Sequence, residues 1–165
     1  VIRYSTSAVY HLAPSGPSLR ALLRRLDHAS IFVFIAAAYT PFALMLMSAS
    51  SGARLLAAAA GLAGAGTVLS LSAPATPRWI RVGLYVGLGW IGAVAITELW
   101  SALQGPAIVL LLFSGILYSA GGAMYAARRP DPFPSVFGYH EIFHAFDIAA
   151  TVILYAVVLI HVLPS

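Results

Sequence analysis

The chain has 165 residues, of which 61% are hydrophobic and only 8% are charged. A soluble domain carries roughly 25% charged residues, so this composition, with its mean hydropathy of +0.91, indicates an integral membrane protein. The sequence has no cysteine, which excludes a disulfide framework and thiolate metal sites. Its nine basic residues are all arginines, and no soluble domain gathers them, which excludes nucleic acid as a partner.

Apolar runs long enough to cross a bilayer as helices, which takes about 20 residues, follow one another along the chain. Residues 1–12 are apolar but too short, and we expect them to be the end of a span whose beginning is missing. Pro14 and Gly16 mark the break that follows, and Pro41 is expected to kink the next span. Five full spans are predicted, at about 28–48, 55–73, 82–98, 107–126 and 137–163.

The fold class that these spans predict is all-α. We expect a polytopic transmembrane helical bundle, made of five full spans and a partial first one, that forms a single domain over residues 1–165.

The placement of the arginines predicts how the bundle is oriented. Alternate loops on one side contain seven arginines, whereas the loops on the other side contain only Arg54. Positive charge in short loops marks the cytoplasmic side, so we expect the C-terminus at Ser165 to lie outside a plasma or inner cell membrane. The seven arginines on the inner side are Arg20, Arg24, Arg25, Arg78, Arg81, Arg128 and Arg129.

Two histidines, His140 and His144, open the last span. Residues four apart lie on one face of a helix, so both imidazoles can reach a single metal ion. The charge count places His11, at the end of the partial span, and Asp27, at the start of the next, in the same leaflet. Because polar groups at membrane depth are costly, this convergence predicts a metal site. The alternative is a pair of interfacial histidines without a metal.

Most of the other polar residues near this leaflet allow two interpretations. Asp27 either caps the start of its helix or orients a metal-bound water. Ser7 lies one turn before His11 and faces the same way, although its hydroxyl can instead bond to its own helix. His28 is expected to be an interfacial residue without a ligand role. Asp147, three residues after His144, can accept a hydrogen bond from a histidine ligand or belong to a proton path.

Three motifs in order resemble those of the hemolysin III / progestin and adipoQ receptor (PAQR) family. The first is Ser-x-x-x-His from Ser7 to His11, the second runs from residue 25 through the Thr-Pro-Phe at 40–42, and the third is His-x-x-x-His from His140. Members of that family have seven spans, so the resemblance implies an N-terminally incomplete fragment of a seven-span fold. It also implies a zinc ion bound by three histidines: His11, His140 and His144.

The resemblance, which extends to adiponectin receptors and alkaline ceramidases, implies a lipid hydrolase. Zinc hydroxide, oriented by Asp27 and supported by Ser7, would attack an amide or ester carbonyl of a membrane lipid from the cytoplasmic leaflet. One alternative is a non-catalytic receptor or hemolysin-like membrane-remodelling protein with structural zinc. The other reads His140 to His144 as the His-Glu-x-x-His pattern of an intramembrane metalloprotease, with Glu141 as the general base.

Overall fold

The protein is described by a computed structural model that covers residues 2–12, 16–103, 105–134 and 136–164. The predicted break at Pro14 and the C-terminal Ser165 lie outside these residues. Within them every regular element is helical, and β pairing is limited to one isolated bridge between Phe133 and Phe137. The elements are α1 (Ile2–Leu12), α2 (Pro17–Ala38), α3 (Thr40–Met45), α4 (Ala49–Ser72), α5 (Arg78–Trp90), η1 (Ile91–Ala95), α6 (Ile96–Ala102), α7 (Gly105–Ala127), α8 (Tyr139–Val157) and η2 (Val158–Val162).

Five helical segments are long and apolar enough to cross a membrane, which confirms the predicted all-α polytopic bundle. They are Pro17–Met45, Ala49–Ser72, Arg78–Ala102, Gly105–Ala127 and Tyr139–Val162. The segment predicted at 28–48 begins eleven residues earlier than expected, because the polar turns that contain Arg20, Arg24 and Arg25 are helical as well. Pro17 occupies the first turn of this helix, where its missing N–H is not needed.

The helix that starts at Pro17 is interrupted near Pro41, as the sequence predicted. Helix α2 ends at Ala38 and α3 begins at Thr40. The Tyr39 hydroxyl at this break lies 2.8 Å from the Leu88 carbonyl oxygen and accepts a bond from the Gly92 N–H at 3.3 Å. Gly92 belongs to the 3-10 segment η1, so the Tyr39 side chain at the break in one span satisfies backbone groups at the irregular part of its neighbour.

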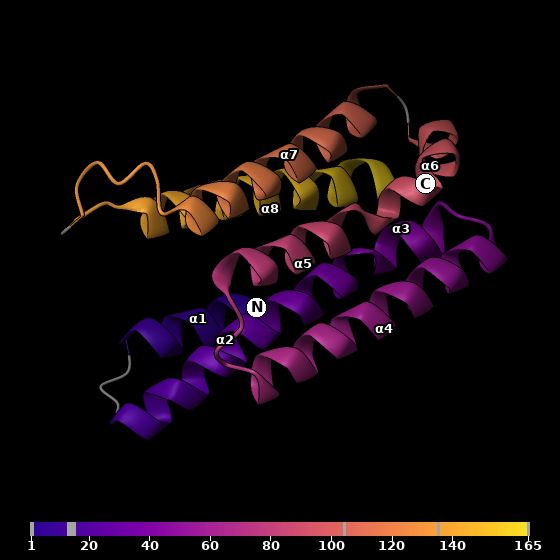
Figure 1. Cartoon of the computed structure of the whole chain (residues 1–165). Helices are drawn as coiled ribbons and strands as arrows, with labels where there is room; N and C mark the ends of the chain where they lie inside the picture. The colour runs from indigo at the N-terminus through magenta and orange to yellow at the C-terminus, as the bar shows by residue number, and fades with distance from the viewer. Residues whose placement is uncertain (1, 13–15, 104, 135, 165) are drawn as a thin grey trace.

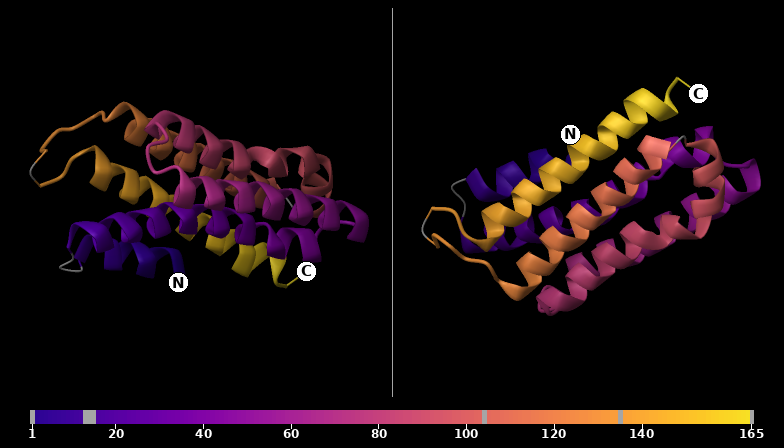
Figure 2. Two further views of the ribbon diagram at one scale, coloured as in Figure 1. Left: turned by 60° about the horizontal axis from the view of Figure 1, so that its bottom comes forward. Right: turned by 90° about the horizontal axis from the view of Figure 1, so that it is seen from above.

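The helices lie roughly along one direction and pack in two groups with α5 between them (Figure 1). Helices α7 and α8 lie side by side, and so do α2 and α4, while α1 packs on α2. Figure 2 shows the same neighbours from two further directions. Small residues permit the close approach of α2 and α4: a Cβ at Gly66 would come within 2.3 Å of the Phe32 ring.

Most of the arginines gather at one end of the bundle, where the 73–77 connection and residues 128–134 and 136–138 also lie (Figure 1). Arg25 on α2 donates to the carbonyl oxygen of Leu71 at 3.1 Å, and Arg78 on α5 donates to that of Tyr125 at 3.4 Å. The first turn of α8 lies at this same end (Figure 1). The charge asymmetry seen in the sequence is therefore an asymmetry of the folded bundle.

Candidate metal centre

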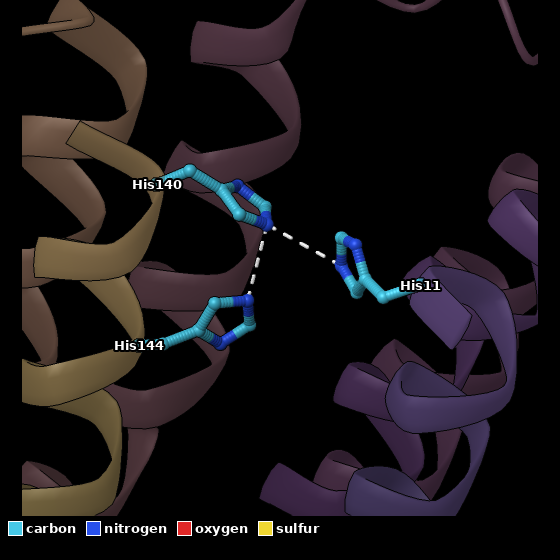
Figure 3. Close-up of side chains that lie close together, drawn as sticks. All are labelled: His11, His140 and His144. Carbon is cyan, nitrogen blue, oxygen red and sulfur yellow. Dashed lines mark hydrogen bonds between the residues drawn. The ribbon is translucent and has the colours of Figure 1, made fainter. Parts of the chain in front are cut away.

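Three histidines meet at the arginine-rich end of the bundle. The Nε2 atom of His140 lies 3.3 Å from Nε2 of His11 and 3.1 Å from Nε2 of His144. Figure 3 shows His140 and His144 projecting from one helix toward His11, which comes from the opposite side. His140 and His144 are half-buried and His11 is exposed. The structure thus brings together the three residues that the sequence marked as metal ligands.

The spacing of these nitrogen atoms suits a single metal ion. Each histidine offers one ligand atom, and the three lie within 4.8 Å of one another. In a tetrahedral site with Zn–N bonds of about 2.0–2.1 Å, two ligand nitrogens lie about 3.3 Å apart. Hydrogen bonding explains the cluster less well, because one imidazole nitrogen carries either one hydrogen or one lone pair and cannot serve two neighbours fully. The histidine cluster (His11, His140 and His144) can therefore hold a metal ion.

The start of α8 fixes the direction of its two histidines. Gly138 precedes the helix, and its backbone N–H donates to the Glu141 carboxylate at 2.9 Å. The Glu141 side chain is exposed and bends back to this helix start. It therefore acts as a capping group, which satisfies a backbone donor and places a negative charge at the helix N-terminus. This arrangement is not that of a general base facing the metal.

Asp27 and Ser7 border the space beside the histidine cluster. Both line an elongated cavity of about 230 Å³ that His140 and His144 also line. Asp27 lies in the interior of α2, ten residues after its first residue, so the interpretation of Asp27 as a helix N-cap is wrong. The reason is that the helix extends back through the arginine-rich turns to Pro17, which moves the cap away from Asp27.

The cavity beside the histidine cluster is mostly apolar. Its wall includes Ile31, Phe34, Ile35, Leu111 and Leu112, and we refer to it as the apolar cavity. It runs from the histidine cluster into the bundle between the α7–α8 pair and the helices α2 and α5. A long hydrocarbon chain is the type of group that such a lining accommodates.

His28 faces a different neighbour from the metal ligands. Its Nδ1 atom lies 3.1 Å from a guanidinium nitrogen of Arg81 on α5, and its carbonyl oxygen accepts a bond from Tyr85 at 3.0 Å. Among the described residues, the group of candidate metal ligands contains His11, His140 and His144 without His28. That His28 has no ligand role stays a prediction.

Asp147 lies one turn deeper on α8, and it is 5% exposed. The Tyr4 hydroxyl donates to its Oδ2 at 3.3 Å and lies 2.7 Å from the Thr151 hydroxyl. Tyr118 on α7 lies 2.7 Å from the same Thr151 hydroxyl. In this Asp147 cluster (Tyr4, Tyr118, Asp147 and Thr151) the buried carboxyl accepts a hydrogen bond from Tyr4 on α1, which provides the partner that a buried polar group requires.

The Asp147 cluster repeats the geometry of the histidine cluster. Tyr4 precedes His11 by seven residues, while Asp147 and Thr151 follow His140 and His144 by seven. Helices α1 and α8 therefore run antiparallel and touch through two polar contacts that are two turns, or roughly 10 Å, apart. Sequence reasoning did not find Tyr4, Thr151 or Tyr118, although the seven-residue offset was a signal that pointed to the first two.

These features define a polytopic α-helical membrane protein with a three-histidine cluster that can hold a metal ion. The profile of the Haemolysin-III related family matches residues 1–155. The chain belongs to this family.

Two relatives illustrate the match. The chain is 34% identical over 151 residues to Hemolysin-3 of Bacillus cereus, which covers 90% of this chain and 65% of that protein. It is 29% identical over 161 residues to the Hemolysin-3 homolog of Bacillus subtilis (strain 168), which covers 98% of this chain and 72% of the relative. The chain thus spans less than two thirds of the length of the Bacillus cereus protein. No solved structure matches the chain.

Proposed function

We propose that this protein binds zinc through His11, His140 and His144 and hydrolyses an amide or ester bond of a membrane lipid. The single observation that supports it most is the convergence of three histidine nitrogens beside the apolar cavity, which His140 and His144 also line. A site for metal alone needs no adjacent apolar space, and an acyl chain alone needs no histidines. Their combination suits a reaction at the polar end of a lipid.

Zinc fits the donor set better than other biological metals. The ligands are imidazoles, the chain has no cysteine, and three protein ligands leave one coordination position open, as in catalytic zinc sites. When bound, zinc lowers the pKa of a water molecule to about 7 and so supplies a nucleophile at neutral pH.

Residues of this chain would transfer the proton, stabilise the developing negative charge and bind the acyl chain. The Asp27 carboxylate, at the wall of the cavity, would orient the attacking water, accept its proton, and pass that proton to the leaving nitrogen or oxygen as the bond to the acyl carbon breaks. The Ser7 hydroxyl donates a hydrogen bond to the carbonyl oxygen as negative charge develops there. The apolar cavity holds the acyl chain and keeps bulk water away from the bond that is cleaved.

The arginines support a position of this site on the cytoplasmic side of the membrane. They gather at the same end of the bundle as the histidine cluster, and the positive-inside rule assigns that end to the cytoplasm. The proposed substrate is then a lipid of the cytoplasmic leaflet of the cell membrane. The C-terminal end of α8 lies on the opposite side.

A second candidate function is a receptor or membrane-remodelling protein in which zinc is structural. The observation that favours it is that the histidine cluster joins α1 to α8, which are 129 residues apart at this contact. A metal ion there would tie the first described helix to the last, whatever chemistry it performed.

The experiment that separates these functions compares lipid turnover, zinc content and stability in the purified protein. Asp27→Asn is expected to retain zinc and stability while turnover falls by roughly 10²–10⁴-fold, the usual contribution of a general base. The matched control is Asp131→Asn, because Asp131 accepts a hydrogen bond from the Tyr139 N–H and does not line the apolar cavity. The hydrolase proposal fails if zinc-loaded wild type turns over no member of a broad panel of lipid amides and esters.

A further inference from the structure

A second, polar chamber opens beside the histidine cluster. It is an open recess of about 560 Å³, lined by His11, His140 and four arginines among other residues. Asp27 supplies the one carboxylate among the described residues that line it. The chamber therefore has an excess of positive charge at the point where two proposed metal ligands are accessible. We call it the basic chamber, and its arginines are Arg24, Arg78, Arg81 and Arg128.

Two of these arginines are held in place by the protein. The Arg78 guanidinium lies over the rings of Tyr125 and Tyr139, at 4.9 and 5.6 Å from their centroids. Arg81 lies 3.1 Å from His28 Nδ1 and donates to the carbonyl oxygen of Thr76 at 3.4 Å. A guanidinium carries five N–H donors, so groups fixed in this way retain capacity for a ligand. Fixed guanidinium groups suit phosphate, which they bind with two parallel hydrogen bonds.

The basic chamber and the apolar cavity are adjacent to each other. Six residues line both spaces: Asp27, His28, Arg78, Arg81, Tyr125 and His140. A molecule that fills both spaces must carry an anionic group at one end and a hydrocarbon chain at the other. His140, between the two spaces, then lies next to the bonds that join the chain to the headgroup.

We infer that the basic chamber binds the phosphate group of an anionic lipid whose acyl chain occupies the apolar cavity. This inference rests on the proposed function where it concerns catalysis, because it names phosphate-bearing lipids as the substrate class of the proposed hydrolase. The binding itself is a separate property. It requires neither a bound metal nor turnover.

Arginines at this end of a membrane protein also serve topology, and the chain offers a matched control for that role. Arg20 and Arg129 lie at the same end and are exposed, as are Arg24 and Arg128, but they do not line the chamber. Arg20 lies one turn before Arg24 on α2, and Arg129 follows Arg128 directly. The double variants Arg24→Gln/Arg128→Gln and Arg20→Gln/Arg129→Gln thus remove the same charge from the same membrane end.

The test measures lipid binding to the purified protein in neutral detergent micelles. The probe is a phosphatidic acid analogue with two ether-linked octyl chains, which has no ester or amide that the protein can hydrolyse. The comparison probes are the dioctyl glycerol ether without phosphate and inorganic phosphate without a chain. Circular dichroism of each variant establishes that it is folded.

The phosphate-bearing lipid is expected to bind more tightly than the neutral ether or inorganic phosphate. Arg24→Gln/Arg128→Gln is expected to weaken its binding roughly tenfold or more, as the loss of charged hydrogen bonds would, and Arg20→Gln/Arg129→Gln to leave it unchanged. Equal weakening in both double variants overturns the inference, and so does equal affinity for the phosphate-bearing and neutral lipids. Inorganic phosphate that binds as tightly as the lipid overturns the assignment to a lipid. Because the probe is not cleavable, failure of the proposed hydrolysis leaves these results unaffected.

Discussion

Helices α1 and α8 meet at two polar contacts that share a geometry but differ in chemistry. In the Asp147 cluster, Tyr4 lies against Asp147 and Thr151, and hydroxyl groups donate to oxygen acceptors. In the histidine cluster, two turns away, His11 lies against His140 and His144, and three ring nitrogens face one another. The first contact is complete with protein atoms alone. In the second contact, a bound cation would satisfy the three ring nitrogens better than they satisfy one another.

This difference indicates what each contact is for. A bundle that needed only a link between α1 and α8 would be served by a second set of hydroxyls and carboxyls like the first. Three imidazoles near one point gain little from each other and much from a metal ion. We therefore interpret the Asp147 cluster as the contact that sets the register of α1. That register places His11 beside His140 and His144, and so forms the histidine cluster.

The largest effect is expected from the histidine cluster. His144→Ala should lower zinc affinity by roughly hundredfold or more, because loss of a group that only supports a ligand already costs 10–100-fold. The stability of the metal-free protein should change far less than that of the zinc-loaded protein. Competition with a chromophoric chelator measures the affinity. His161→Ala, at the other end of the same span, is the control and should bind zinc like wild type.

The next largest effect is expected from Asp147. Asp147→Ala removes the buried carboxylate that accepts the Tyr4 hydroxyl and leaves the Thr151 bond to the backbone carbonyl of residue 147 in place. The loss of this carboxylate should destabilise the metal-free protein by about 1–3 kcal/mol. Asp147→Asn keeps an acceptor oxygen and should recover most of that stability. Chemical unfolding in detergent after chelation measures both. If Asp147→Ala instead abolished zinc binding without any loss of stability in the metal-free form, Asp147 would be part of the metal site.

A smaller effect is expected from Tyr4. Tyr4→Phe removes the hydroxyl but keeps the ring, so it should cost about 1 kcal/mol of stability and weaken zinc binding only modestly through a looser α1. Tyr155→Phe, at an exposed position on α8, should stay within about 0.5 kcal/mol of wild type. Identical stabilities of the two variants would show that the Tyr4 hydroxyl does not fix the register.

The smallest effect is expected from Glu141, which interrupts the histidine pair in sequence. Glu141→Gln should leave zinc affinity and lipid turnover unchanged and cost only about 0.3–1 kcal/mol, since its carboxylate caps the start of α8. Turnover assays with zinc-loaded protein check this. Loss of a peptidase activity in this variant, with zinc retained, would restore the metalloprotease interpretation.

Sequence reasoning predicted the parts of this molecule that follow from local pattern. Hydropathy marks the five spans, and the four-residue spacing of His140 and His144 marks one side of the histidine cluster. His11 could be added because charge asymmetry places it in the same leaflet. The true start of α2 was missed because arginine-rich turns at a membrane surface are helical without being apolar. The partners of Asp147 and the arginines of the basic chamber were missed because they depend on how helices pack, which hydropathy does not encode.

The most direct test of this account is the zinc content of His11→Ala compared with wild type, after both are purified in the presence of zinc and dialysed. Wild type is expected to retain about one zinc ion per chain, and His11→Ala to retain little while its helical content is unchanged. His11 lies far from His140 in sequence, so only the folded contact between α1 and α8 brings it to the other two histidines. Full zinc retention by folded His11→Ala would contradict the three-histidine site.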